Sequence, residues 1–128
     1  MNFLKKLFRQ TRELNSTQKT SYYSQFNNKS EQINRNISGK KNEKNGDITI
    51  AIKNYEKNIA EGFVGNYPYD RLAIIYRKNK DYENEIRVLK QAIEIFHALL
   101  KTSPRQDLCT KLEKFQNRLI KAEKLKKQ

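Results

Sequence analysis

The chain has 128 residues, of which 36% are hydrophobic and 32% are charged, and its formal net charge is +13. It contains one cysteine, Cys109, and one histidine, His97, which excludes a disulfide framework within the chain and a Cys/His zinc site. No apolar run approaches the roughly 18 residues that a membrane span needs. Residues 1–9 lack the continuous apolar core and cleavage site of a secretory signal. We therefore expect a cytoplasmic protein.

The positive charge is concentrated at both ends of the sequence. Residues 1–46 hold ten Lys or Arg against three Asp or Glu, residues 47–97 hold eight of each, and residues 98–128 hold nine against three. This distribution predicts basic flanks on a neutral scaffold, not a domain folded around a basic groove. A Lys/Asn/Ile-rich composition is also typical of AT-rich genomes, so part of the charge has a purely compositional explanation.

The N-terminal part of the chain, up to position 30, is predicted to lie outside the main domain. Residues 1–14 are expected to form a basic amphipathic helix, because apolar residues such as Phe3, Leu7 and Phe8 share one side. That helix would bind anionic lipid or a partner, or else pack on the protein's own core. Residues 15–30 are polar and are predicted to be a flexible linker. Their aromatic residues would form a local cluster on the domain surface, stack on bases or fill a partner's pocket; these residues are Tyr22, Tyr23 and Phe26.

Helical periodicity begins after this linker. Residues 31–45 predict a short, poorly stabilised helix with Ile33 and Ile37 at helical spacing. Gly46 would end that helix and Asp47 would cap the next one, over residues 48–61. A loop then leads to Pro68, which is well placed at the start of a following helix.

The densest apolar region, residues 66–96, predicts two helices joined by a turn at residues 79–81. The second of these, over residues 82–102, is apolar on two faces and is expected to have neighbours on both. Residues 105–126 predict a last amphipathic helix that caps the domain with its apolar stripe inward and its basic side outward, or else serves as a dimerisation helix. The basic stripe beside the apolar one comprises Lys111, Lys114, Arg118 and Lys121.

Two of these units align when the sequence is shifted against itself. The alignment places Asp47 on Asp81, Ile52 on Ile86 and Ile59 on Ile93. The period of this shift, about 34 residues with helix–turn–helix units, is that of tetratricopeptide repeats. Residues 69–96 also resemble a degenerate tetratricopeptide unit directly. The residues that carry this resemblance are Tyr69, Leu72-Ala73, Tyr76, Asp81-Tyr82 and Ala92.

The sequence departs from the family pattern at three places. Glu85 stands where alanine is usual, Lys80 replaces the turn glycine, and the closing proline arrives only at Pro104. The resemblance implies an all-α fold, a short α-solenoid of stacked helical hairpins over residues 31–104, followed by the basic cap over residues 105–128. Such repeats cover one another's apolar faces.

The sequence favours binding over catalysis. Neither His97 nor Cys109 has an evident catalytic partner, and no phosphate-binding loop or metal motif appears. We expect no enzymatic activity and no cofactor. The resemblance implies an adaptor that takes a peptide or partner protein in a helical groove, although the family's carboxylate-clamp residues are not present. The residues expected to face that groove are Asp70, Arg71, Ile74, Arg77 and Lys78.

Two alternative functions use the basic flanks instead. The basic stripe and the C-terminal lysines could track phosphates of a nucleic acid, with the aromatic residues of the linker stacking on bases. Recruitment to a membrane surface by residues 2–14 is the second alternative.

Overall fold

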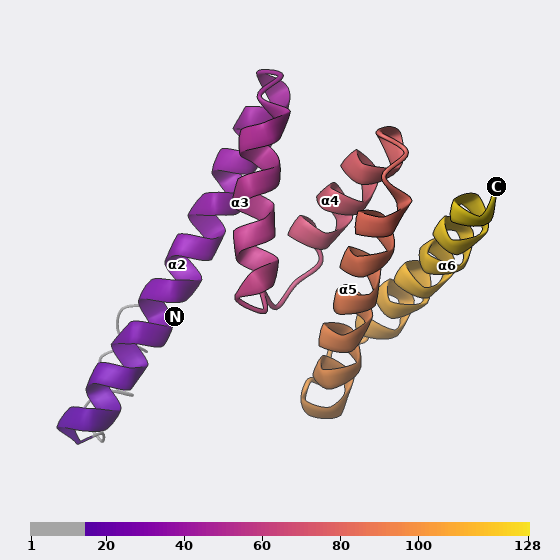
Figure 1. Ribbon diagram of the computed structural model, residues 1–128. Coiled ribbons are helices and arrows are strands. Elements are labelled where there is room, and N and C mark those ends of the chain that lie inside the picture. Colours follow the sequence, from indigo (N-terminus) through magenta and orange to yellow (C-terminus); the bar gives the residue numbers. More distant parts are fainter. Residues whose placement is uncertain (1–14) are drawn as a thin grey trace. The chain divides into compact units, whose positions relative to one another are not determined.

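The computed structural model describes residues 15–128, except for the side chains of residues 19–27. The described part is all-helical and its helices pack in neighbouring pairs, which confirms the predicted all-α hairpin stack. The helix predicted over residues 1–14 lies outside the described residues. Figure 1 labels the helices α2 (Ser16–Lys44), α3 (Ile48–Ala60), α4 (Tyr67–Lys78), α5 (Tyr82–Thr102) and α6 (Leu108–Lys127).

Helix α2 corrects the prediction of a flexible linker over residues 15–30. The structure instead has one helix of 29 residues. The backbone N–H of Gln18 donates to Asn15 Oδ1 at 2.8 Å, and that of Asn15 donates to Gln18 Oε1 at 3.0 Å. This reciprocal pair satisfies two donors at the helix start. No proline or glycine interrupts the helix before Gly39, so a segment with a weak apolar signal still continues as one helix.

The chain divides into two compact units, residues 1–34 and residues 35–128. The described part of the first unit consists of Asn15 and the first part of α2. Helices α3 to α6 and the end of α2 lie in the second unit.

Within the second unit, the last part of α2 packs closely on α3. Gly39 lies against the fully buried ring of Tyr55, and a Cβ atom at Gly39 would lie only 2.6 Å from Tyr55 Cζ and nearer still to Cε1. Polar contacts extend this interface: the Asn58 amide donates to Asn36 Oδ1 at 2.8 Å, and Arg35 pairs with Glu61 at 2.8 Å. Glycine therefore permits a helix contact that any side chain would obstruct.

The two hairpin turns repeat the spacing of the two sequence units. Gly46 and Lys80, at equivalent positions, both have positive φ angles, of 83° and 58°. The amides of Asp47 and Asp81 each donate to the carbonyl of the residue five positions earlier, both at 2.8 Å. Both aspartates occupy the N-cap position of the next helix, but only the Asp81 side chain accepts a hydrogen bond from the following helical turn. The predicted cap at Asp47 thus occupies the N-cap position without a side-chain hydrogen bond to the helix.

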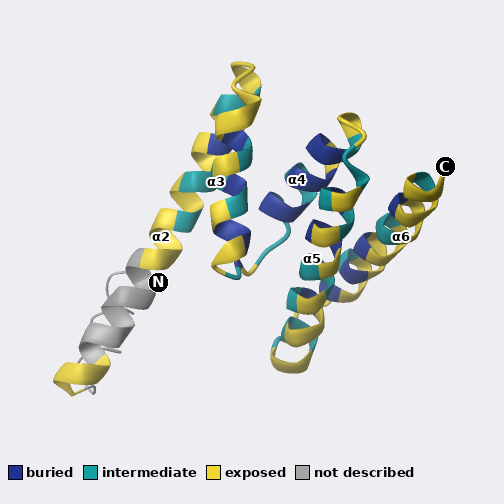
Figure 2. Cartoon of the chain, viewed as in Figure 1, coloured by how far each residue is buried: buried dark blue, intermediate teal, exposed yellow. Residues whose placement is uncertain are grey.

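Helix α5 is central, with contacts to both α4 and α6, as its two apolar faces predicted. Figure 2 shows the buried positions of α4, α5 and α6. Val88, Leu89, Ala92 and Phe96 are at most 1% exposed. The rings of Phe96 and Phe115 meet edge to face with centroids 5.2 Å apart, so α6 covers one face of α5.

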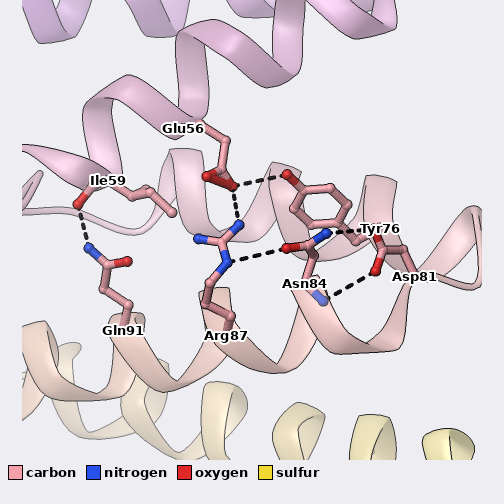
Figure 3. A network of polar contacts seen from close by, with 7 residues as sticks. All are labelled: Glu56, Ile59, Tyr76, Asp81, Asn84, Arg87 and Gln91. Carbon is pink, nitrogen blue, oxygen red and sulfur yellow. Dashed lines mark hydrogen bonds and ion pairs between the residues drawn. The ribbon is translucent and has the colours of Figure 1, made fainter.

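A polar network joins α3, α4 and α5 (Figure 3). Glu56 accepts hydrogen bonds from the Tyr76 hydroxyl at 3.0 Å and from Arg87 Nη2 at 2.6 Å. The side-chain amide of Gln91 donates to the carbonyl of Ile59. Successive hairpins are therefore held together by hydrogen bonds as well as by apolar packing. These contacts fix the position of α4 between α3 and α5.

Candidate functional site: the α4–α6 groove

An open cavity of about 590 Å³ lies between α4 and α6, and we call it the α4–α6 groove. A neighbouring cavity of about 480 Å³ shares Arg77, Lys114 and Arg118 with it and continues along α6 as far as Lys121. The two cavities thus follow one side of α6. The groove is lined by Tyr67, Asp70, Arg71, Ala73, Ile74, Arg77, Lys78, Glu85, Lys114 and Arg118.

All the residues that the sequence predicted to face a groove line this cavity. They lie one and two helical turns apart on α4, so they share a face. The opposite face of α4 is buried in the core through residues such as Leu72, Ile75 and Tyr76. The predicted set is Asp70, Arg71, Ile74, Arg77 and Lys78.

Arg71 joins α4 to the end of α2. Its Nε and Nη2 atoms lie 3.1 and 2.6 Å from the two carboxylate oxygens of Glu43, and the Tyr55 hydroxyl donates to the same carboxylate at 2.6 Å. Burial disfavours the charged form of Glu43, but the hydrogen bonds from Arg71 and Tyr55 outweigh it and hold the pKa of Glu43 below its usual value. The charge of Arg71 is therefore largely committed to holding two helices together.

Arg77 is fixed at the groove by a buried carboxylate on α5. Glu85 is fully buried, and its Oε2 lies 2.7 Å from Arg77 Nε. Arg77 Nη2 also donates to the backbone carbonyl of Arg118 at 3.2 Å. Burial raises the pKa of Glu85, while the charges of Arg77 and Arg118 oppose that shift. Sequence reasoning noted Glu85 as an unusual residue at its repeat position but did not assign it to the groove.

Helix α6 is attached to α4 at Asp70. Arg118 Nη1 lies 2.7 Å from Asp70 Oδ1, and Asn66 Nδ2 donates to Asp70 Oδ2 at 2.7 Å. Lys111 Nζ in turn donates to Asn66 Oδ1 at 3.1 Å and pairs with Asp107 at 3.2 Å. The prediction that the whole basic stripe faces outward was therefore wrong for Lys111 and Arg118, because the flank of α6 that carries them turns toward α4.

Three lysines along the two cavities are not engaged in this way. Lys78, Lys114 and Lys121 are exposed and form no hydrogen bond or ion pair with any described residue. Lys78 acts on its surroundings only through its field, which helps to lower the pKa of Glu43. Over both cavities together, six cationic side chains face three carboxylates, those of Asp70, Glu85 and Glu113. The groove is thus cationic, contrary to the expectation that the scaffold itself carries no basic groove.

The groove also offers apolar surface. Ala73 and Ile74 form part of its wall, and Ile74 is 41% exposed although its neighbours on α4 are buried. Tyr67 lines the same wall and meets Tyr55 edge to face, with ring centroids 5.9 Å apart. An apolar surface between cationic side chains suits a ligand that carries both apolar and acidic groups.

The other sequence hypotheses have little structural counterpart. Residues 2–14 lie outside the described residues, and the side chains of Tyr22, Tyr23 and Phe26 are not described. Within residues 15–128, none of the helices with described side chains is both long and apolar enough to cross a membrane. In the same part of the chain, no three His, Cys, Asp or Glu side chains are grouped to hold a metal ion, and Cys109 is an exposed free thiol.

Comparison of the chain with protein-family models, with curated proteins and with solved structures found no match. The likeness to tetratricopeptide repeats therefore depends on the residues quoted above and on the two equivalent turns at Gly46 and Lys80.

Proposed function

We propose that this protein is a non-enzymatic, tetratricopeptide-like adaptor that binds a peptide segment of a partner protein in the α4–α6 groove. The observation that carries the proposal is the composition of that cavity. Exposed Ile74 and the uncommitted Lys78 and Lys114 lie in one concavity of about 590 Å³, a size within the range of ligand pockets.

The scaffold around the groove supports this proposal. Arg77 and Arg118 are held by carboxylates on neighbouring helices, so a ligand would meet side chains that are already ordered. A preordered site binds more tightly because less conformational entropy is lost on association. Stacked helical hairpins commonly present such concave binding surfaces, although the fold by itself does not define a function.

A cytoplasmic location belongs to the same proposal. The lone thiol of Cys109 is exposed, and exposed unpaired thiols are typical of reducing compartments. Nucleic-acid binding along the basic stripe is the weaker candidate, because Lys111 and Arg118 already contact groups of α4 or its N-cap residue.

A photo-crosslinking residue at Ile74 tests the proposal in the native host. We expect it to capture a partner protein that the same residue placed at exposed Lys53 on α3 does not capture. Lys114→Glu in the Ile74 crosslinking protein should abolish capture, whereas Lys53→Glu should not. Lys114 and Lys53 are suitable for charge reversal because neither forms an ion pair with a described residue. Reversal of Arg71 or Arg77 would instead break the contacts to Glu43 or Glu85.

The result that contradicts the proposal is equally specific. Capture from Lys53 and Ile74 alike, or capture from Ile74 that Lys114→Glu leaves unchanged, would place any partner outside the groove.

A further inference from the structure

We infer that the occupant of the α4–α6 groove is an acidic segment of another protein, in which carboxylates flank an apolar side chain. This inference rests on the proposed function and specifies the chemistry of its ligand. It is carried by the charges that remain uncommitted in the groove, by the apolar wall between them, and by the charge of the chain itself.

The uncommitted charges along the two cavities are mainly positive. Lys78, Lys114 and Lys121 have no ion pair with a described residue. Among the acidic side chains that line the two cavities, Glu113 likewise has no ion pair with a described residue. Lys114 lines both cavities, so a ligand that enters either one passes it. Carboxylates of a ligand would complement this surplus, which favours encounter and orientation.

The arginines of the groove increase the same field without being free to move. Arg77 is tied to Glu85 and to the carbonyl of Arg118, and Arg118 is tied to Asp70. Their side chains are 34% and 18% exposed. A partly buried, ordered guanidinium can receive a second carboxylate through its remaining N–H groups, because it has five donors in a fixed plane.

The apolar wall determines what lies between the carboxylates. Ile74 lies one helical turn from both Arg77 and Lys78 on α4, and it is the exposed apolar side chain of α4 that lines the groove. An apolar side chain of the ligand placed on Ile74 would remove its own surface and that of Ile74 from water. A ligand with only charged side chains would either leave Ile74 exposed to water or place a charged group against Ile74, where the loss of hydration is unfavourable.

The charge of the chain argues against two nearer occupants. Residues 1–14 contain four Lys or Arg and one Glu, so the field of the groove repels them. A second copy of the chain is unsuitable because it carries +13 overall and no two of its 14 acidic residues are adjacent. A nucleic acid fits less well than an acidic peptide, because its regularly charged backbone cannot keep phosphates away from Asp70, Glu85 and Glu113, whereas a peptide can place its carboxylates at the lysines alone.

Fluorescence anisotropy with designed probes tests this inference on the full chain. The probes are a labelled peptide of about 12 residues that alternates pairs of Glu with pairs of Leu, the same peptide with Gln in place of Glu, and an oligo-dT strand of similar length. We expect the acidic peptide to bind at least about tenfold more tightly than the Gln peptide, and its affinity to fall with added salt.

Matched variants then locate the binding. Lys114→Glu should weaken binding of the acidic peptide by about tenfold or more, and Ile74→Asp should do the same, whereas Lys53→Glu should leave it unchanged. Circular dichroism confirms that each variant retains its helices. A double variant, Lys78→Gln with Lys114→Gln, provides a second binding measurement. It removes positive charge without introducing repulsion, and it should also weaken binding of the acidic peptide.

The alternative results are distinguishable from one another. Equal affinity for the acidic and Gln peptides, both weakened by Ile74→Asp, overturns the inference but leaves a peptide groove in place. Tighter binding of oligo-dT, lost in Lys114→Glu, overturns it in favour of nucleic acid. Acidic-peptide binding that no groove variant weakens also overturns it. Failure of the Ile74 crosslinker to capture any protein in the native host would instead contradict the proposed function.

Discussion

Gly39→Ala isolates the close contact between α2 and α3. In an exposed helix this change stabilises by about 1 kcal/mol, because alanine is the better helix former. Here the new Cβ would lie 2.6 Å from Tyr55 Cζ and nearer still to Tyr55 Cε1. Ordinary contacts between carbon atoms are about 3.5–4.0 Å, so a fully buried ring must move by roughly 1 Å, or the helices must separate.

The cost has two parts. Overpacking of a buried site typically destabilises by about 1–3 kcal/mol. Movement of the ring also disturbs the 2.6 Å hydrogen bond from the Tyr55 hydroxyl to Glu43, and a bond to a charged group is worth about 1.5–3 kcal/mol. After the gain in helix propensity is subtracted, Gly39→Ala should lower the free energy of unfolding by roughly 2–4 kcal/mol.

Urea unfolding followed by circular dichroism measures this loss at constant m-value. Ser38→Ala, at an exposed position on the same helix, is the matched control and should change stability by less than about 0.5 kcal/mol. In a Tyr55→Leu background the obstructing ring atoms are absent, so Gly39→Ala should become neutral or stabilising. A double-mutant cycle quantifies that coupling. Unchanged or increased stability of Gly39→Ala in the otherwise native chain would refute the close contact.

Three further predictions concern the turn, the buried acid and the tyrosines. Lys80→Gly should raise the free energy of unfolding by about 0.5–1 kcal/mol, because Lys80 has a φ of 58°; a lower urea midpoint would contradict this. Burial raises the pKa of Glu85, so its contribution to stability is fully present below the unfolded pKa, near 4.5, and is lost as pH rises through the folded pKa. The wild-type urea midpoint should therefore decline with rising pH in this range, and Glu85→Gln should remove the part of the decline that is due to Glu85. Parallel pH profiles of the wild-type and variant midpoints would contradict the raised pKa of Glu85. Burial raises the pKa of Tyr69 and of Tyr76 to about 12, so stability should fall between about pH 10 and pH 12. An absorbance titration should show these two tyrosines ionising late, together with loss of helix, and early ionisation of all seven tyrosines in a folded chain would contradict their burial.

Local signals predicted most of the helical framework. The apolar periodicity of residues 82–102 matched α5 (Tyr82–Thr102). The predicted groove residues on α4 also line one cavity. These features depend on residues three to five positions apart, and the geometry of a helix converts such spacings directly into a shared face. Helix α2 was underestimated because its start depends on Asn15 and Gln18, and a polar helix has almost no apolar period to recognise.

The sequence by itself therefore determined which face of α4 would be left uncovered, but only the tertiary structure decided what stands opposite it. Arg118 meets Asp70 across 48 positions of the chain, and its partner depends on the direction in which α6 crosses α4. The same packing buries Glu85 beneath Arg77 and requires glycine at position 39. The counts of charged residues along the sequence indicated a neutral scaffold and a basic C-terminal segment. Packing placed the lysines of that end beside α4, because electrostatic fields add by distance in space and not by position in the sequence.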